Sequence, residues 1–243
     1  MESGYYDSIQ QVSRDHRRLV DAINQCNKTP VIAEIKYASP SSGRIREFEP
    51  PLRIATDMLD GGACGLSILT DPVSFQGGVH ILSQLAKTVQ APLLMKDIIV
   101  SPRQLSAAAR AGADGVVLIS ELFTEGLGEE DLVAMVKEAK RLGLETLVEA
   151  NGVDEFNRIR HCEPDLYGIN NRNLSTFAVD LDTTRLILSQ TEKVDGPVVS
   201  ESGIENRSDV KQLKNAGAHA FLVGMSVMRS NNIKAKVREL VNA

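Results

Sequence analysis

The sequence predicts a (β/α)₈ barrel. Along its 243 residues, eight short apolar runs alternate with eight amphipathic segments, which is the pattern of parallel strands joined by crossover helices. One turn also recurs at residues 61–66, 111–116 and 216–221, where glycine follows a helical pattern and small residues lead into an apolar run. A doubly wound open sheet is the main alternative, but eight units would make it unusually wide.

The elements follow in regular order after a polar opening stretch. That stretch, to about Lys28, has apolar residues at helical spacing (Ile9, Val12, Leu19, Val20 and Ile23) and predicts a helix on the outside of the body, ended by Thr29-Pro30. The predicted strands are Val31–Lys36, Gly65–Thr70, Pro92–Asp97, Gly115–Ile119, Thr146–Ala150, Leu166–Asn170, Pro197–Glu201 and Ala220–Gly224. The predicted helices are Leu52–Leu59, Ile81–Thr88, Arg103–Ala111, Asp131–Leu142, Val153–Arg160, Leu181–Leu188, Arg207–Ala216 and Ile233–Val241.

Composition indicates an ordinary globular protein in a reducing compartment. We expect one domain over residues 1–243, with 1–29 as a helical extension and 30–243 as the barrel, because no linker or composition shift divides the chain. A net charge of −5 argues against broad binding of nucleic acid or anionic membranes. Three cysteines without metal-ligand spacing, no signal peptide and no membrane-length apolar run predict a cytoplasmic protein.

Charged residues end several of the predicted strands, which is expensive for buried segments and needs a reason. Strand alternation places Glu34 and Lys36 on the inner face if Ala33 and Ile35 pack on the helices. A structural ion pair would explain these two charges alone. It does not explain why further strands end in the same way.

The same alternation places Lys96, Glu149, Asn170 and Glu201 in that polar layer, at the mouth where barrel enzymes keep their chemistry. With Glu34 and Lys36 this gives five ionisable groups, more than a core needs. Close packing of such groups shifts pKa values toward those of useful acids and bases. Lys96 is the best candidate acid and Glu149 the best candidate base.

The last two strands carry the signal of an anion site. Ser202 and Gly203 follow the seventh strand, and Gly224 and Met225 follow the eighth, where barrels frequently bind phosphate. Two ordinary glycine-containing loops are the alternative. The long polar loop after the first strand, which contains Ser39, is either a lid or a simple connector.

These residues carry a resemblance that covers about Pro30 to Arg229. The motifs AEIK and ASPS (33–36 and 38–41), LMKD (94–97), LVE (147–149), GINNRNL (168–174), SESGI (200–204) and LVG (222–224) resemble the indole-3-glycerol-phosphate synthase family, in order and in spacing. The resemblance implies a TIM barrel of tryptophan biosynthesis. Such an enzyme closes the indole ring of 1-(2-carboxyphenylamino)-1-deoxyribulose 5-phosphate with loss of carbon dioxide and water, and no metal or organic cofactor takes part.

The resemblance also implies residue roles. Lys96 would be the general acid, Glu149 the base for dehydration, and Lys36, paired with Glu34, would lie near the substrate carboxylate. The expected substrate-binding residues are Ser39, Asn170, Arg172 and Glu201, and the expected phosphate-binding residues are Ser202, Gly203, Gly224 and Met225. Arg172 could instead tether its own loop. The expected partner is this small sugar-phosphate anthranilate substrate, with no nucleic acid or membrane, and the chain is expected to be a monomer or weak homo-oligomer.

Two alternatives remain at this point. Phosphoribosylanthranilate isomerase is another barrel of the pathway, but it would want a Cys–Asp pair and no cysteine ends a predicted strand. The other is a barrel that binds a phosphorylated ligand without catalysis, which the intact Lys96 and Glu149 disfavour. The chain also departs from the family pattern at Tyr37 and Ile98 and in the 71–75 loop, which thins the aromatic wall expected around the anthranilate ring.

Overall fold

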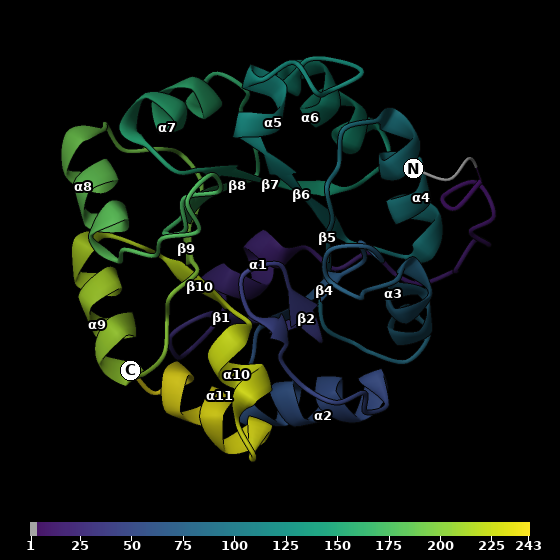
Figure 1. Cartoon of the computed structure of the whole chain (residues 1–243), viewed down its shortest axis with the longest axis horizontal. Coiled ribbons are helices and arrows are strands. Elements are labelled where there is room, and N and C mark those ends of the chain that lie inside the picture. The colour runs from purple at the N-terminus through teal and green to yellow at the C-terminus, as the bar shows by residue number, and fades with distance from the viewer. Residues whose placement is uncertain (1–3) are drawn as a thin grey trace.

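A computed structural model describes residues 4–243. In this part of the chain, eight parallel strands close into a barrel, each hydrogen-bonded to its neighbours (Figure 1). In order around the barrel they are β1 (Val31–Ile35), β4 (Gly65–Leu69), β5 (Leu93–Lys96), β6 (Gly115–Ile119), β7 (Glu145–Ala150), β8 (Leu166–Asn170), β9 (Val198–Glu201) and β10 (Ala220–Val223). The predicted fold class is confirmed, and each strand agrees with its predicted range to within a residue at either end.

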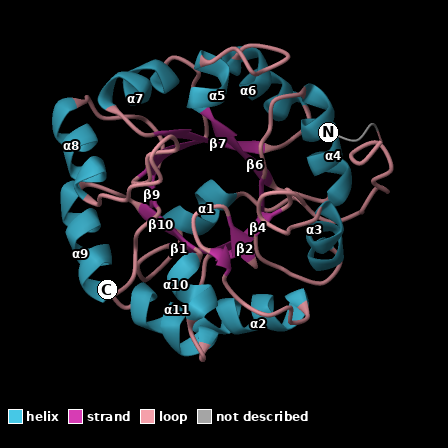
Figure 2. Cartoon of the chain, in the orientation of Figure 1, coloured by secondary structure: helices cyan, strands magenta, loops and turns pink. Residues whose placement is uncertain are grey.

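Helices form an outer ring around the strands (Figure 2). They are α2 (Pro51–Gly61), α3 (Val79–Ala86), α4 (Pro102–Ala111), α6 (Leu132–Arg141), α7 (Val153–Arg160), α8 (Asp182–Gln190), α9 (Arg207–Ala216) and α11 (Ile233–Val241). Glycines 62, 112 and 217 end α2, α4 and α9 with φ of 106°, 85° and 111°, the left-handed conformation that glycine adopts without strain. The recurring turn in the sequence is therefore a helix cap that leads directly into the next strand.

Three small elements at the mouth were not predicted. They are the hairpin of β2 (Ala38–Ser39) with β3 (Gly43–Arg44), the helix α5 (Ser120–Thr124) and the helix α10 (Met225–Arg229). All are too short to give a periodic signal in the sequence.

Two apolar layers hold the barrel together. Ala33 and Ile35 belong to the outer layer, between strands and helices, as the alternation predicted. The inner layer includes Ile32, Leu94, Val117, Leu147, Leu166, Val199, Ala220 and Leu222. Four of these residues, Ile32, Leu94, Leu147 and Val199, lie two positions before Glu34, Lys96, Glu149 and Glu201. The charged layer therefore lies directly above an apolar core.

The N-terminal segment corrects one prediction. Its helix, α1, covers only Leu19–Asn24, and residues 9–18 are not helical. The preceding residues run along α4, where the Val12 amide donates to the Arg110 carbonyl at 2.8 Å. The helix lies inside the ring of strands when the barrel is viewed along its axis, and Leu19 and Ile23 pack into the inner layer (Figure 1). The prediction of one helix on the outside was wrong. The residues around Val12 lie along α4, whereas Leu19 and Ile23 pack inside the barrel, so the two parts of the segment contact different surfaces.

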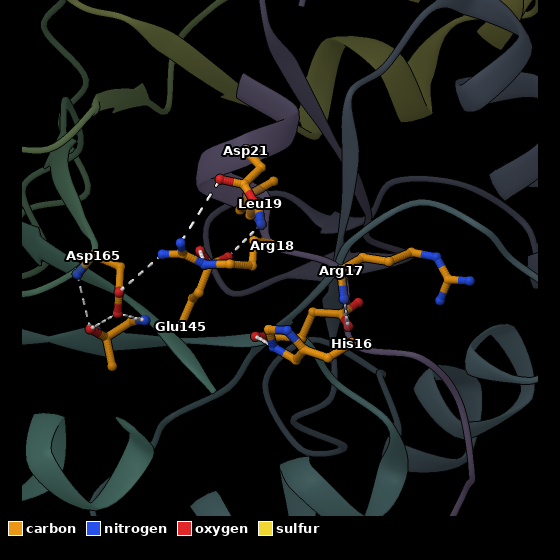
Figure 3. Close-up of polar contacts among 9 residues, drawn as sticks. His16, Arg17, Arg18, Leu19, Asp21, Glu145 and Asp165 are labelled. Atoms are coloured by element: carbon orange, nitrogen blue, oxygen red, sulfur yellow. Dashed lines mark hydrogen bonds and ion pairs between the residues drawn. The ribbon is translucent and has the colours of Figure 1, made fainter. Parts of the chain in front are cut away.

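Polar contacts fasten α1 to the bottom of the barrel (Figure 3). The Glu145 carboxylate, at the start of β7, accepts hydrogen bonds from the Leu19 amide and from Arg18 Nε, the latter at 3.1 Å. The Arg17 amide donates to Asp114 Oδ1 at 2.8 Å. Because Glu145 is buried, these donors compensate for the loss of water around its charge.

Leu19→Ala is expected to lower the free energy of unfolding by about 3 kcal/mol, because Leu19 is 2% exposed and closes the inner layer. Urea denaturation followed by circular dichroism measures the change. Leu186→Ala on α8 is the matched control, since Leu186 is 49% exposed and its truncation should cost no more than about 0.5 kcal/mol. Equal losses in the two variants would show that α1 does not close the core.

Candidate active site

Lys96 stands at the centre of the charged layer. It is the last residue of β5, and its ammonium forms ion pairs with Glu149 of β7 and, at 2.7 Å, with Glu201 of β9. Both carboxylates are buried, at 3% and 1% exposure. Residues separated by more than a hundred positions in the chain thus meet at one ammonium, as the barrel prediction required.

The three groups shift one another's pKa values. Burial alone would lower the pKa of Lys96, but the charges of Glu149, Glu201 and Glu34 outweigh burial and raise it. Burial would likewise raise the pKa of Glu149, but Lys96 and hydrogen bonds to its carboxylate lower it. Burial and then the negative charge of Glu149 raise the pKa of Glu201 well above its usual value. Lys96 and Glu149 therefore stabilise each other's charged forms, while the negative charge of Glu149 makes Glu201 the harder of the two carboxyl groups to ionise.

Strand β8 supplies the polar neighbours of Glu149. Asn170 Nδ2 donates to Glu149 Oε2 at 3.1 Å, and Asn170 Oδ1 accepts from the Arg172 amide at 3.0 Å, which fixes the orientation of the side-chain amide. Gly168 lies below them, and a Cβ atom there would come within 3.0 Å of Glu201 Oε1. Sequence reasoning did not single out Gly168 for this role, although a glycine within a buried strand is a signal of close approach.

Glu34 and Lys36 form a second charged pair at the end of β1. Lys36 Nζ lies 3.5 Å from Glu34 Oε1, and Ser67 Oγ of β4 donates to Glu34 Oε2 at 3.4 Å. The Lys36 ammonium also lies over the ring of Phe75, 5.2 Å from its centroid, a cation–π contact. Phe75 thus keeps one aromatic side chain beside the charged layer, in the loop that lacks the family's paired aromatics.

The loops after β9 and β10 present backbone donors. Ser202 and Gly203 have φ of +68° and +79°, consecutive left-handed residues that turn the chain sharply. Among the described residues, the amides of Gly203, Ile204 and Met225 have no hydrogen-bond acceptor. A cleft of about 580 Å³ between α10 and α11 includes Met225 and Ser226 in its lining, but it also includes Glu205 and Glu239 and is not lined by Ser202, Gly203 or Gly224. Unpaired amides in two adjacent loops suit an anion.

The remaining predicted residues lie as follows. Ser39 is buried in the β2–β3 hairpin, with its hydroxyl 3.4 Å from that of Ser41. Arg172 Nη1 donates to the Phe177 carbonyl at 2.9 Å, so its guanidinium ties together the loop after β8. Of the two roles considered for Arg172, the tether is the one with a contact in the structure, and its binding of substrate stays a prediction.

Gly224→Ala is expected to reduce kcat by about 100-fold, because displacing a charged group by about 1 Å has effects of this size. The added methyl would lie 2.5 Å from Glu34 Oε1, which is too close for both groups to keep their positions, so the Glu34 carboxylate would have to move. Steady-state kinetics measure the loss. Gly152→Ala is the control, since a Cβ there has no neighbour within 4 Å. A normal kcat for Gly224→Ala would mean that the position of Glu34 is unimportant.

The family follows from comparison with known proteins. A sequence model described as "Indole-3-glycerol phosphate synthase" matches residues 3–240. The chain belongs to the indole-3-glycerol phosphate synthase family. The activity expected from the motifs is thereby confirmed, that of a carboxy-lyase of tryptophan biosynthesis, and the isomerase alternative is set aside.

Individual relatives agree with this membership. The indole-3-glycerol phosphate synthase of Koribacter versatilis is 41% identical over 211 residues, covering 87% of this chain and 79% of that protein. The indole-3-glycerol phosphate synthase of Microcystis aeruginosa is 42% identical over 214 residues, covering 86% of this chain and 71% of that protein.

Solved structures with low sequence identity support the fold alone. Thiamine phosphate pyrophosphorylase from Pyrococcus furiosus has a TM-score of 0.62 at 17% identity, covering 88% of this chain and 94% of that one. N-acetylmannosamine-6-phosphate 2-epimerase from Clostridium perfringens has a TM-score of 0.65 at 12% identity, covering 89% and 93% of the two chains. No described helix of the present chain has the length and apolar character needed to cross a membrane.

Proposed function

We propose that Lys96 is the general acid of the synthase reaction. Ring closure joins the ring carbon that bears the carboxylate to the ribulose carbonyl carbon, and the carbonyl oxygen must gain a proton as it becomes a hydroxyl. Lys96 is held as an ammonium between two buried carboxylates, and this single observation carries the proposal. The developing alkoxide is a strong base, so it can take a proton even from an ammonium whose pKa is raised.

Glu149 is the base for dehydration. Its carboxylate is ionised, because the positive charge of Lys96 and hydrogen bonds such as that from Asn170 lower its pKa. Once Lys96 has given its proton to the substrate, that positive charge is gone and the basicity of Glu149 rises. The two steps are therefore coupled: acid catalysis by Lys96 makes Glu149 a stronger base, which removes a proton from the decarboxylated intermediate and returns it to the departing hydroxyl, so that water leaves, and Lys96 regains its own proton from solvent.

Lys36 holds the substrate carboxylate until it leaves as carbon dioxide. Its pairing with Glu34 and its position over Phe75 fix the ammonium without neutralising it by a close contact, since the ion-pair distance is 3.5 Å. Phe75 offers an apolar face beside this charge, which suits the anthranilate ring.

The other contacts hold the substrate. Asn170 and Glu201 hydrogen-bond the intermediate, and Ser39 covers it from the hairpin of β2 and β3. Ser202, Gly203, Gly224 and Met225 bind the phosphate, supported by the unpaired amides of the two loops. Arg172 supports the loop after β8 and borders the substrate from there.

Residues 1–243 act as one domain, with 1–29 as the extension of barrel 30–243; the first three residues lie outside the described part. The chain's own side chains supply acid and base, so no metal or cofactor is proposed. The three unpaired cysteines support a cytoplasmic location, and the small sugar-phosphate substrate requires no partner beyond a monomer or weak homo-oligomer.

To test the synthase activity, 1-(2-carboxyphenylamino)-1-deoxyribulose 5-phosphate is added to the protein, and formation of the product is followed by indole fluorescence with and without EDTA. Turnover that is unaffected by EDTA is expected. Binding of the substrate without formation of indole would favour the non-catalytic barrel instead. Competition by inorganic phosphate, weakened in Ser202→Pro, would support the assignment of the phosphate loops, because proline cannot adopt the φ of +68° at this position and so disrupts the turn that presents the amides.

A further inference from the structure

The N-terminal segment reaches the mouth of the barrel as well as its bottom. We call Tyr5 and Tyr6 the N-terminal latch. The Tyr6 hydroxyl donates to Asp97 Oδ2 at 3.0 Å, and Asp97 is the residue directly after Lys96. The Tyr5 hydroxyl lies 3.4 Å from the Thr70 carbonyl and accepts from the Val79 amide at 3.1 Å. The two rings pack edge to face, with centroids 4.9 Å apart. The latch thus contacts the ends of two adjacent strands, β4 and β5.

On the side facing β6, the backbone of Lys96 is not held by strand pairing. The register between β5 and β6 ends at Met95, which pairs with Val116. On the other side, Lys96 pairs with Leu69, and the Thr70 amide donates to the Lys96 carbonyl at 3.0 Å. The backbone of Lys96 is therefore held by its pairing with β4 and by the contacts that fix the next residue, Asp97.

Asp97 is buried, at 3% exposure, and several donors surround its carboxylate. Thr70 Oγ1 and the Tyr6 hydroxyl donate to Oδ2, and the Ile98 amide donates to Oδ1 at 2.8 Å. A buried carboxylate satisfied in this way has one preferred orientation. The proposed reaction gives Asp97 no role in chemistry, so its burial beside the acid calls for another explanation.

Gln104 joins the latch to the rest of the β5 loop. Its Nε2 donates to the Tyr6 hydroxyl at 3.3 Å and to the Ile98 carbonyl at 2.8 Å, while its Oε1 accepts from the Val100 amide at 2.9 Å. Arg110 of α4 holds the Tyr6 carbonyl at 2.9 Å. The Tyr6 phenol is therefore fixed by contacts from both sides and can act as a rigid brace.

We propose that Tyr6 is a positioning residue for the synthase reaction: by holding Asp97, its hydroxyl fixes the direction in which the neighbouring Lys96 points. The inference rests on the proposed role of Lys96. Tyr6 does not touch the reacting atoms. Its hydroxyl matters because an acid displaced by about 1 Å from a developing alkoxide transfers its proton far less efficiently.

The test compares Tyr6→Phe with wild type. The variant removes one oxygen atom, and we expect kcat to fall about 10-fold while KM stays within about twofold, since substrate contacts remain. Tyr167→Phe is the matched control, because Tyr167 lines a cleft shared with Arg18, away from the charged layer, and the variant should keep wild-type kinetics. Rates are expressed per folded protein, well below each melting temperature, so that lost stability does not count as lost rate.

A double-mutant cycle with Asp97→Asn locates the effect. If Tyr6 acts through Asp97, the loss caused by Tyr6→Phe should shrink to about twofold or less in the Asp97→Asn background. A kcat of Tyr6→Phe within about twofold of wild type would overturn the proposal, and so would an equal loss in both backgrounds.

Lys96→Ala separates this proposal from the one on which it rests. If Lys96→Ala keeps its turnover, the assignment of the acid fails and the latch has nothing to position. If Lys96→Ala is inactive but Tyr6→Phe is normal, only the latch fails.

Discussion

Lys96→Ala is expected to lower kcat by about 10³-fold, within the range typical of a lost general acid. The side chain lies between Glu149 and Glu201, and without it no described ammonium is paired with either carboxylate. The fold should survive, because buried carboxyl groups left without a cation take up protons and become neutral. Indole fluorescence measures the rate, and circular dichroism checks the fold.

Lys87→Ala is the control for this variant, since Lys87 is exposed at the end of α3. It should keep wild-type kcat. Retained turnover in Lys96→Ala with a normal spectrum would contradict the assignment of the acid and would leave Lys36 as the remaining cation of the charged layer.

Glu149→Gln is expected to lower kcat by about 10²–10³-fold while leaving KM nearly unchanged, because glutamine keeps the shape of the side chain but cannot accept the proton. Glu125→Gln, at an exposed position, is the control. A larger loss of substrate affinity than of rate would indicate that Glu149 binds the substrate and is not its base.

The pH profile gives an independent check on the same residue. The pKa of Glu149 is lowered from 4.5, so its carboxylate stays ionised at more acid pH than that of an ordinary glutamate. The decrease of kcat on the acid side of the pH profile should therefore occur below pH 4.5. In Lys96→Ala the charge that lowers this pKa is absent, so the acid limb of the residual activity should move to higher pH. An unmoved limb would mean that the two groups are not coupled.

The sequence was a good guide to the barrel and to its charged layer for a physical reason. Buried parallel strands leave near-continuous apolar runs, and strand alternation fixes which side chains share a face. Glu34, Lys96, Glu149 and Glu201 therefore lie at one mouth as expected.

The N-terminal segment was misjudged because its apolar spacing fits a helix equally well. Val12 packs in the outer layer and Leu19 in the inner layer, so tertiary contacts at two separate surfaces decided the conformation. Similarly, no local pattern places Tyr6 against Asp97 or Phe75 under Lys36, because these contacts join segments whose approach depends on the closed barrel.

The anchoring of α1 has a consequence for synthesis on the ribosome. The Leu19 amide binds a carboxylate 126 positions later, and the Arg17 amide binds one 97 positions later. A nascent chain that has not yet reached residue 145 lacks the acceptor for Leu19, so the earliest-made helix must wait, undocked, while the first half of the barrel emerges. Its insertion is therefore expected to be a late folding event, although it belongs to the first tenth of the polypeptide.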